Sequence, residues 1–174
     1  MTQTITNARP YEANLDPESP NRNLTPLTTS LDADDRLIVG DCLLSDLAQR
    51  YGTPLYVLDE QTLRSTCRAY RDALKRHYPG PSLPIYASKA NSSLVMSSLV
   101  ASEGLGLDAV SAGELLTALR GGMPGDRMVL HGNNKSDEEL LLAYNNNVTV
   151  VVDNQHDLDR LSALIPKDGN PVRL

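Results

Sequence analysis

From residue 83 onward, short apolar runs rich in β-branched residues alternate with amphipathic segments, one pair per roughly 20 residues. Strands are predicted over 83–87, 105–110, 127–130 and 148–152, with a further strand beginning at 171–174. The segments between them predict helices over 92–103, 112–120, 137–144 and 155–164. Such alternation is typical of parallel strands joined by right-handed crossovers, which occur in a (β/α)8 barrel and in an open doubly wound sheet.

The number of units favours an incomplete α/β barrel. The chain of 174 residues holds four complete strand–helix units and the start of a fifth, whereas a (β/α)8 barrel usually takes about 250 residues. Ending inside a buried strand would also leave a parallel sheet edge uncovered. We therefore expect the chain to be part of a longer protein, with about four to five of eight units present.

The first third of the chain lacks this alternation. Residues 1–36 are rich in Pro, Asn, Thr and Asp without any period, which predicts a mostly flexible tail or a loosely docked arm. Residues 37–58 predict a strand over 37–39, a short helix capped by Asp41, and a strand over 55–58. A long helix over 60–78 then opens the third part, residues 59–174, which is the partial barrel.

Local sequence patterns support the predicted helices. Ser111 with Glu114, and Ser136 with Glu139, have the spacing of capping boxes. Gly104 and Gly121 stand where helix ends favour a left-handed residue.

Composition and charge exclude several classes of function. The net charge of −6 argues against a nucleic-acid partner. No apolar run approaches the ~20 residues of a membrane span, and no signal peptide is recognisable, so we expect a cytoplasmic protein without a membrane partner. Cys42 and Cys67 have no metal-site spacing, no zinc or phosphate-loop motif occurs, and we expect no metal. Gly104-Leu-Gly106 precedes its strand, so it is not a dinucleotide fingerprint.

Four polar residues follow the ends of successive predicted strands: Lys89, Asp108, His131 and Asp153, separated by 19, 23 and 22 residues. Taken singly, each has an ordinary interpretation, such as a solvated loop lysine, a structural histidine or a helix cap. Because the carboxyl ends of parallel strands meet on one face, their regular spacing indicates a shared site.

A lysine at that face suggests Schiff-base chemistry, which needs the neutral amine. Partial burial among polar groups would favour the neutral form, whereas the Asp108 carboxylate nearby would favour the ammonium form. The sequence leaves that balance open.

The segment Pro84-Ile-Tyr-Ala-Ser-Lys-Ala-Asn91 resembles the Y-A-x-K-A-N motif of the fold-type III, alanine-racemase-like decarboxylases that use pyridoxal 5'-phosphate (PLP). Segments 51–57, 106–115, 131–136 and 148–153 agree with that family in order and spacing, so the resemblance covers about residues 37–174. The wording His-Gly-Asn-Asn-Lys-Ser at 131–136 is similar to the diaminopimelate branch of the family in particular.

The resemblance implies a cofactor and roles for four residues. Lys89 would hold PLP through a Schiff base, while Ala87, Asp108 and His131 would line the cofactor pocket. The implied reaction is decarboxylation of meso-2,6-diaminopimelate, a small amino-acid substrate, to L-lysine and carbon dioxide, with the cofactor as electron sink.

The resemblance also places parts of the site outside the chain. Residues 37–58 would join a C-terminal β domain. The phosphate loops, the substrate-binding residues and the cysteine shared across a homodimer would all follow Leu174, so we expect little or no activity from the chain alone. Alternatives are an ornithine or arginine decarboxylase or a racemase of the same type, a non-catalytic PLP-binding fragment, and a class I aldolase without cofactor.

Overall fold

The computed structural model describes residues 9–10, 18 and 24–174, and the chain divides into two compact units, residues 1–66 and 67–174. In the first unit, four short strands form an antiparallel sheet in the order β1-β2-β3-β4. Their bounds are Arg9–Pro10 (β1), Ser30–Leu31 (β2), Leu37–Val39 (β3) and Cys42–Leu43 (β4). Helix α1, Leu44–Tyr51, follows β4 directly and ends at Gly52.

A two-residue hairpin joins β3 to β4 and corrects the role expected for Asp41. Gly40 and Asp41 both have positive φ angles, of 55° and 61°, and Val39 pairs with Cys42 across them. Such a turn needs φ above zero at both central residues, and Gly and Asp tolerate it best. Asp41 therefore does not cap α1, whose N-cap residue is Leu43 without any side-chain cap.

Two further expectations for this unit differ from the structure. Ser30 pairs with Ile38 and Leu31 with Leu37, so residues 30–31 belong to the sheet rather than to a flexible tail. Residues 1–8, 11–17 and 19–23 of the same predicted segment lie outside the described residues. The strand expected over 55–58 is not formed: these residues have no ladder partners, and Tyr56 is almost fully exposed.

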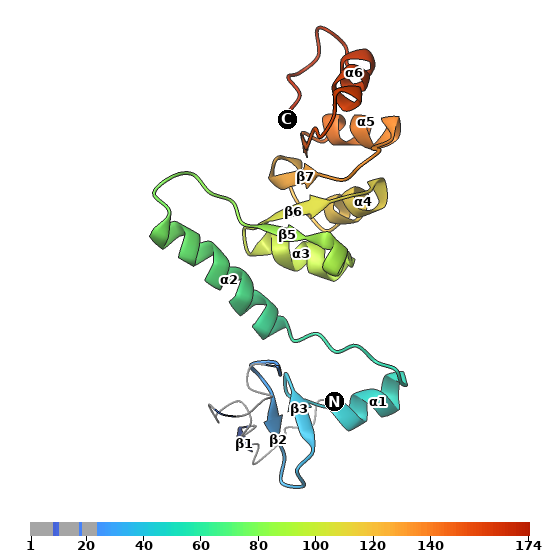
Figure 1. Cartoon of the computed structure of the whole chain (residues 1–174). Coiled ribbons are helices and arrows are strands. Elements are labelled where there is room, and N and C mark those ends of the chain that lie inside the picture. The colour runs from blue at the N-terminus through green and yellow to red at the C-terminus, as the bar shows by residue number, and fades with distance from the viewer. Residues whose placement is uncertain (1–8, 11–17, 19–23) are drawn as a thin grey trace. The chain divides into compact units, whose positions relative to one another are not determined.

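The second unit is built around a parallel sheet in the order β5-β6-β7-β8 (Figure 1). Helix α2, Glu60–His77, leads into it across the boundary between the units. Because the strands are adjacent in chain order, with no reversal, the sheet has the sequential order of a barrel wall rather than that of a doubly wound fold. The bounds are Ile85–Ala87 (β5), Leu94–Ser102 (α3), Gly106–Ala109 (β6), Ala112–Arg120 (α4), Met128–Leu130 (β7), Asp137–Asn145 (α5), Thr149–Val150 (β8) and Gln155–Leu164 (α6).

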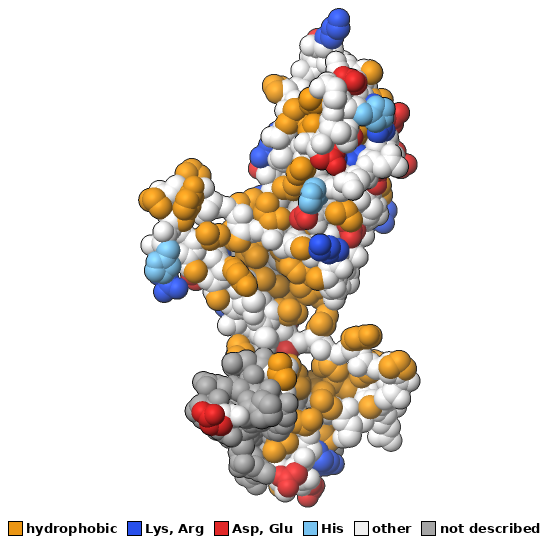
Figure 2. Space-filling view, in the orientation of Figure 1, with side chains coloured by type: hydrophobic (Ala, Val, Ile, Leu, Met, Phe, Trp, Pro, Cys, Tyr) orange, Lys and Arg blue, Asp and Glu red, His pale blue; other side chains and the backbone are white. Residues whose placement is uncertain are grey.

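The helices that follow the strands lie on one side of this sheet (Figure 1). Alternate strand residues face them, and these form the core, with Leu107, Met128, Leu130 and Val150 all fully buried. The strand residues on the other face of the sheet are less buried, and Ile85 among them is 45% exposed. Figure 2 shows hydrophobic side chains at the surface of this unit around β5 and α3.

The predicted fifth strand is represented by one backbone hydrogen bond. The Val150 N–H donates to the Arg173 carbonyl at 2.9 Å, although residues 171–174 are not assigned to a strand. One residue near the end of the chain therefore bonds to β8, but the strand predicted over 171–174 is not formed.

Helix ends confirm part of the predicted capping. Ser136 and Glu139 form a complete capping box, whereas Glu114 accepts the N–H of Val110 at 2.6 Å instead of that of Ser111. Gly104 has φ of 82°, as expected. At the end of α4, by contrast, the left-handed residue is Gly122, and Gly121 has right-handed helical angles. Gly121 lies against α3, where an added Cβ would come within 2.9 Å of Ser97 Cβ.

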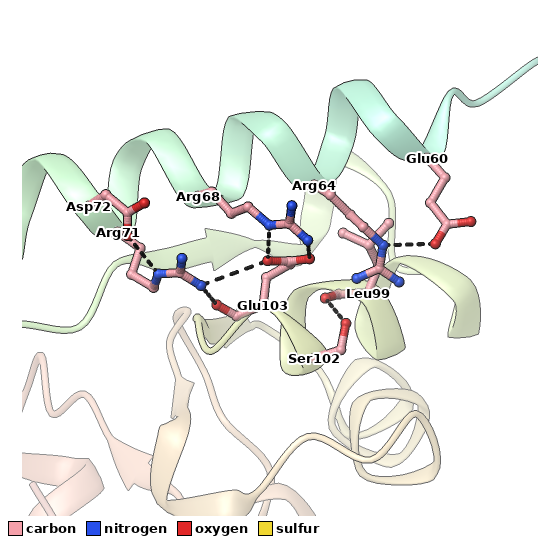
Figure 3. Close-up of polar contacts among 8 residues, drawn as sticks. All are labelled: Glu60, Arg64, Arg68, Arg71, Asp72, Leu99, Ser102 and Glu103. Atoms are coloured by element: carbon pink, nitrogen blue, oxygen red, sulfur yellow. Dashed lines mark hydrogen bonds and ion pairs between the residues drawn. The ribbon is translucent and has the colours of Figure 1, made fainter. Parts of the chain in front are cut away.

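An ion-pair cluster ties α2 to the end of α3 (Figure 3). Glu103, only 5% exposed, accepts two hydrogen bonds from Arg68 at 2.8 and 2.9 Å, and Arg71 donates to its backbone carbonyl at 2.9 Å. Bidentate Arg–carboxylate pairs of this kind combine strength with fixed geometry. Because Glu103 precedes β6, the cluster lies at the amino end of the sheet, away from the polar residues that follow the strands.

Among the described residues, no helix is long and apolar enough to cross a membrane. Within the same part of the chain, no three His, Cys, Asp or Glu side chains gather in a way that could hold a metal ion.

Candidate active site

The carboxyl ends of β5, β6 and β7 bring Lys89, Ala87, Asp108 and His131 to one end of the sheet. Ala87 pairs with Asp108, and Asp108 pairs with Val129, so these residues lie in one row across the sheet. Lys89 follows Ala87 by two residues, and His131 follows Val129 by two. The sheet register therefore supports the expectation that these side chains share one end of the sheet.

Lys89 stands in a 3-10 turn, Ser88–Ala90, directly after β5. Its side chain is exposed, and within the described ranges it has no hydrogen bond or ion pair. The structure thus leaves this amine accessible at the expected end of the sheet, without a direct contact to Asp108.

Asp108 has one carboxylate oxygen without a partner. Oδ1 is buried and, among the described residues, has no hydrogen bond, while Oδ2 lies 3.7 Å from His131 Nδ1. The aspartate side chain is 26% exposed and the histidine 58% exposed. The His131 N–H donates to the Ala109 carbonyl at 2.8 Å, which continues the pairing of β7 with β6 and fixes the start of the next loop. A buried acceptor without a donor is uncommon in proteins and is typical of functional sites.

The turn that carries Lys89 is closed by its own neighbours. The Tyr86 hydroxyl donates to the Asn91 carbonyl at 3.2 Å, across the turn, and Asn91 Oδ1 accepts the Ser93 N–H at 3.0 Å. Burial raises the pKa of the Tyr86 hydroxyl, which therefore stays a donor. Ser88, within the turn, is buried with its hydroxyl unpaired in the described structure.

Glu139 joins the loops that follow β6 and β7. Its carboxylate accepts the N–H of Ala112, the first residue of α4, at 3.1 Å, and the N–H of Ser136 at 2.7 Å. Burial opposes ionisation of Glu139, but these hydrogen bonds and that of the Ser136 hydroxyl outweigh it and lower the pKa of the carboxyl. One ionised side chain therefore holds two neighbouring loops of the site.

Asp153, the fourth polar residue of the predicted set, belongs to a different cluster. Its Oδ1 accepts from Asn154 Nδ2 at 2.8 Å and lies 3.5 Å from Lys135 Nζ. The N-cap of α6 is Asn154, whose Oδ1 accepts the Asp157 N–H at 2.9 Å. Although desolvation opposes it, hydrogen bonding with Asp157 and the positive charge of Lys135 lower the pKa of Asp153.

Sequence reasoning missed Lys135 and Asp157, which form the buried centre of this second cluster. Lys135 Nζ donates to Asp157 Oδ2 at 2.7 Å, and both side chains are at most 2% exposed. The available signal was the position of Lys135 within the His131–Ser136 motif, four residues after the histidine. No local pattern, however, indicates that a lysine in a polar loop is buried.

Comparison with known proteins supports the resemblance. The sequence pattern of the family "Pyridoxal-dependent decarboxylase, pyridoxal binding domain" matches residues 60–174. A diaminopimelate decarboxylase from Synechocystis sp. is 42% identical over 164 residues, which cover 90% of this chain and 35% of that protein.

Solved structures agree with the sequence relatives. The diaminopimelate decarboxylase of M. jannaschii in complex with L-lysine has a TM-score of 0.74 at 32% identity, over 79% of this chain and 32% of that one. A lysine/ornithine decarboxylase from Vibrio vulnificus complexed with putrescine has a TM-score of 0.62 at 26% identity, over 76% and 34%. The chain thus spans about a third of the length of these relatives. Its parallel sheet is part of a (β/α)8 barrel, and the cofactor of this family is pyridoxal phosphate. The chain belongs to the pyridoxal-dependent decarboxylase family.

Proposed function

We propose that this chain contributes the lysine-bearing part of a PLP-dependent decarboxylase that converts meso-2,6-diaminopimelate to L-lysine and carbon dioxide. The proposal rests on the accessible Lys89 amine and the buried, unpaired carboxylate oxygen of Asp108, which share the end of the sheet where barrel enzymes place their chemistry. The substrate is that of the related diaminopimelate decarboxylases.

The residues present fit the cofactor. Lys89, free of competing partners within the described structure, would hold it covalently. Ala87, in the same row as Asp108, offers a small side chain beside the place where a flat ring would lie. Asp108 Oδ1 would accept a hydrogen bond from a donor brought in by the bound group, which would satisfy the one buried oxygen left unpaired there.

Each side chain would then have a simple task. Pyridoxal phosphate, when bound, supplies a ring that accepts the electron pair left behind by the departing carboxylate. Lys89 would fix the place of that ring, and Asp108 its orientation. His131, with Nδ1 toward Asp108 Oδ2, would line the same end of the sheet and hold the carboxylate in place when protonated.

The full-length protein would be larger than the 174-residue chain. We propose a cytoplasmic homodimer at the full length of the relatives, with the site completed by further segments. We expect the 174-residue chain to release carbon dioxide only at background rate, because the sheet face that carries Ala87 and Asp108 leaves Ile85 open to water. A decarboxylation site excludes water from the reacting atoms.

Lys89 is tested first by covalent trapping. The chain is incubated with PLP, reduced with borohydride and mapped by peptide mass spectrometry, and we expect the label at Lys89. Lys89→Ala should lose it, while Lys75→Ala, at an exposed lysine in the last turn of α2, should keep it. A label spread over all lysines, or placed on another one, would contradict the site.

The reaction is tested in a chimera in which residues 37–174 replace the matching segment of the Synechocystis relative. We expect carbon dioxide release from meso-diaminopimelate, at least about 10³-fold reduced by Lys89→Ala because the covalent anchor is lost. Ornithine and arginine are the comparison substrates, since the Vibrio vulnificus structure is named for ornithine. Turnover of ornithine alone would refute the substrate, and a folded, labelled but inactive chimera would support a non-catalytic PLP-binding fragment.

A further inference from the structure

A buried lysine lies next to the proposed site without any role in the chemistry described so far. Lys135 is 2% exposed, and its ammonium donates to Asp157 Oδ2 at 2.7 Å, with Asp153 Oδ1 at 3.5 Å as a second carboxylate. Lysine is almost never fully buried unless it is paired. This side chain therefore reaches from the loop after β7 to the loop after β8 and the first turn of α6.

Lys135 is the buried side chain of its loop, whose other contacts are made near the surface or by the main chain. The loop runs from His131 to Ser136, and apart from Lys135 the stretch between Leu130 and Leu140 has no buried side chain. Gly132 and Asn134 have φ angles of 101° and 54°, a left-handed region that costs a non-glycine residue energy. A loop with such a backbone needs a strong anchor to keep one conformation.

The anchor is fixed on both sides. Arg160 donates to the backbone carbonyl of Lys135 and pairs with Asp137, so the main chain at this position is held from α6 as well. The two aspartates are also held, because Asn154 Nδ2 donates to the Asp153 carboxylate and Asn154 Oδ1 accepts the backbone N–H of Asp157. The contact has defined direction and distance at each end.

Stability alone is a weak reason for such a pair. The cost of removing two charges from water offsets most of their attraction, and apolar side chains of similar volume are often as stable. A charged pair differs from an apolar one in that its hydrogen bonds fix geometry. The pair formed by Lys135 therefore contributes more to the placement of the loop than to stability.

We propose that Lys135 is a positioning residue: its ammonium locks the loop 131–136 to α6 and thereby holds His131 against Asp108. The first residue of that loop is His131, whose imidazole lies 3.7 Å from Asp108. The effect on cofactor binding rests on the proposed function, whereas the effect on the loop does not. In this arrangement α6 influences the site without touching it.

Hydrogen exchange followed by NMR tests the loop directly. The amides of His131 and Ser136 are the probes, since they donate to the Ala109 carbonyl and the Glu139 carboxylate. In Lys135→Met we expect both to exchange about tenfold faster relative to the Leu115 amide in α4, as local opening becomes easier. In Lys75→Met, which alters an exposed lysine, the three amides should keep their wild-type rates.

A double variant separates positioning from folding. Lys135→Met combined with Asp157→Leu replaces the ion pair by an apolar pair, and should recover the thermal midpoint lost in the single variant. We expect exchange at His131 and Ser136 to stay as fast as in Lys135→Met, and the borohydride-trapped label at Lys89 to be about tenfold below wild type in both variants. Recovery of the loop amides together with the midpoint would show that Lys135 only fills space, and would overturn the proposal.

A mild variant covers the case in which the others do not fold. Asp153→Asn keeps the buried pair and removes only the second, half-exposed carboxylate, and should speed exchange at His131 by about two- to threefold. If the His131 and Ser136 amides exchange at the wild-type rate both in Asp153→Asn and in Lys135→Met, the positioning role is refuted. A wild-type chain without label at Lys89 would instead refute the proposed function, and the exchange data would still decide about Lys135.

Discussion

At the scale of single residues, the site end of the sheet combines groups that are left unsatisfied with groups that are held in place. Asp108 Oδ1 and the Ser88 hydroxyl are buried without partners in the described structure. The Tyr86 hydroxyl, by contrast, donates to the Asn91 carbonyl and closes the turn around Lys89. Buried polar groups without partners cost stability, and functional sites commonly bear that cost.

Removing the charge of Asp108 should separate stability from cofactor binding. In Asp108→Asn we expect the free energy of unfolding to stay unchanged or rise by up to about 1 kcal/mol, because a partly buried and incompletely paired charge is removed. Trapping of PLP at Lys89 should fall by about tenfold. Thermal unfolding and borohydride labelling measure the two effects, with Asp126→Asn, exposed at the amino end of β7, as the control. A loss of stability without loss of label would contradict the role of Asp108.

Tyr86 and Tyr144 form a matched pair of tyrosines. Each makes one hydrogen bond to the backbone, Tyr86 as donor to Asn91 and Tyr144 as acceptor from Asn170, and only the first closes the lysine turn. Tyr86→Phe and Tyr144→Phe should each lower the free energy of unfolding by about 1 kcal/mol. Only Tyr86→Phe should slow label formation at Lys89, as measured by a time course of trapping. Equal labelling rates would show that the turn needs no closure.

At the scale of the elements, the helices at the site end are capped by side chains that also join neighbouring loops. Glu139 caps α5 and accepts from the first residue of α4, and Glu114 of α4 accepts from Val110 after β6. The loop that follows β6 and the loop that begins with His131 are therefore anchored by side chains of the helices behind them.

The Glu139 contribution should depend on pH. Its pKa is lowered in the folded state from the usual 4.5, so the stabilisation is complete above pH 4.5 and is lost as the pH falls through the lower folded value. At pH 7 we expect Glu139→Gln to lower the free energy of unfolding by about 1 kcal/mol, through loss of the capping box. The difference from wild type should shrink in urea titrations below pH 4. Glu138→Gln, at an exposed neighbour, should stay within about 0.5 kcal/mol of wild type at either pH.

At the scale of the whole molecule, the parallel sheet has one face packed against helices and one face with little cover. Leu107 faces the helices and is fully buried, whereas Ile85, on the other face, is nearly half exposed. Leu107→Ala should therefore lower the free energy of unfolding by about 2 to 5 kcal/mol, as in other cores. Ile85→Ala should cost less than about 1 kcal/mol in this chain. Urea unfolding of both variants measures the difference, and equal losses would mean that both faces are packed.

The regular part of the fold was predictable because its signals are local. Helices α4 and α6 begin and end where the pattern of apolar residues and N-caps indicated, and the long helix ends one residue early. Predictions failed where two local interpretations compete. Asp41 is as suitable for a left-handed turn as for a cap, and pairing across Val39 and Cys42 decided between them. The apolar run at 55–58 has strand propensity, but a strand also needs a partner.

The sequence by itself determined the alternation of strands and helices, the family motif around Lys89, and the spacing that brings Asp108 and His131 to the same end of the sheet. These follow from periodicity and from the geometry of parallel strands. Only the tertiary structure decided that Asp108 keeps an unpaired oxygen, that Asp153 turns toward Lys135, and that Lys135 is buried against Asp157. Burial and pairing of these charges depend on side chains 18 and 22 residues away along the chain, which no local pattern encodes.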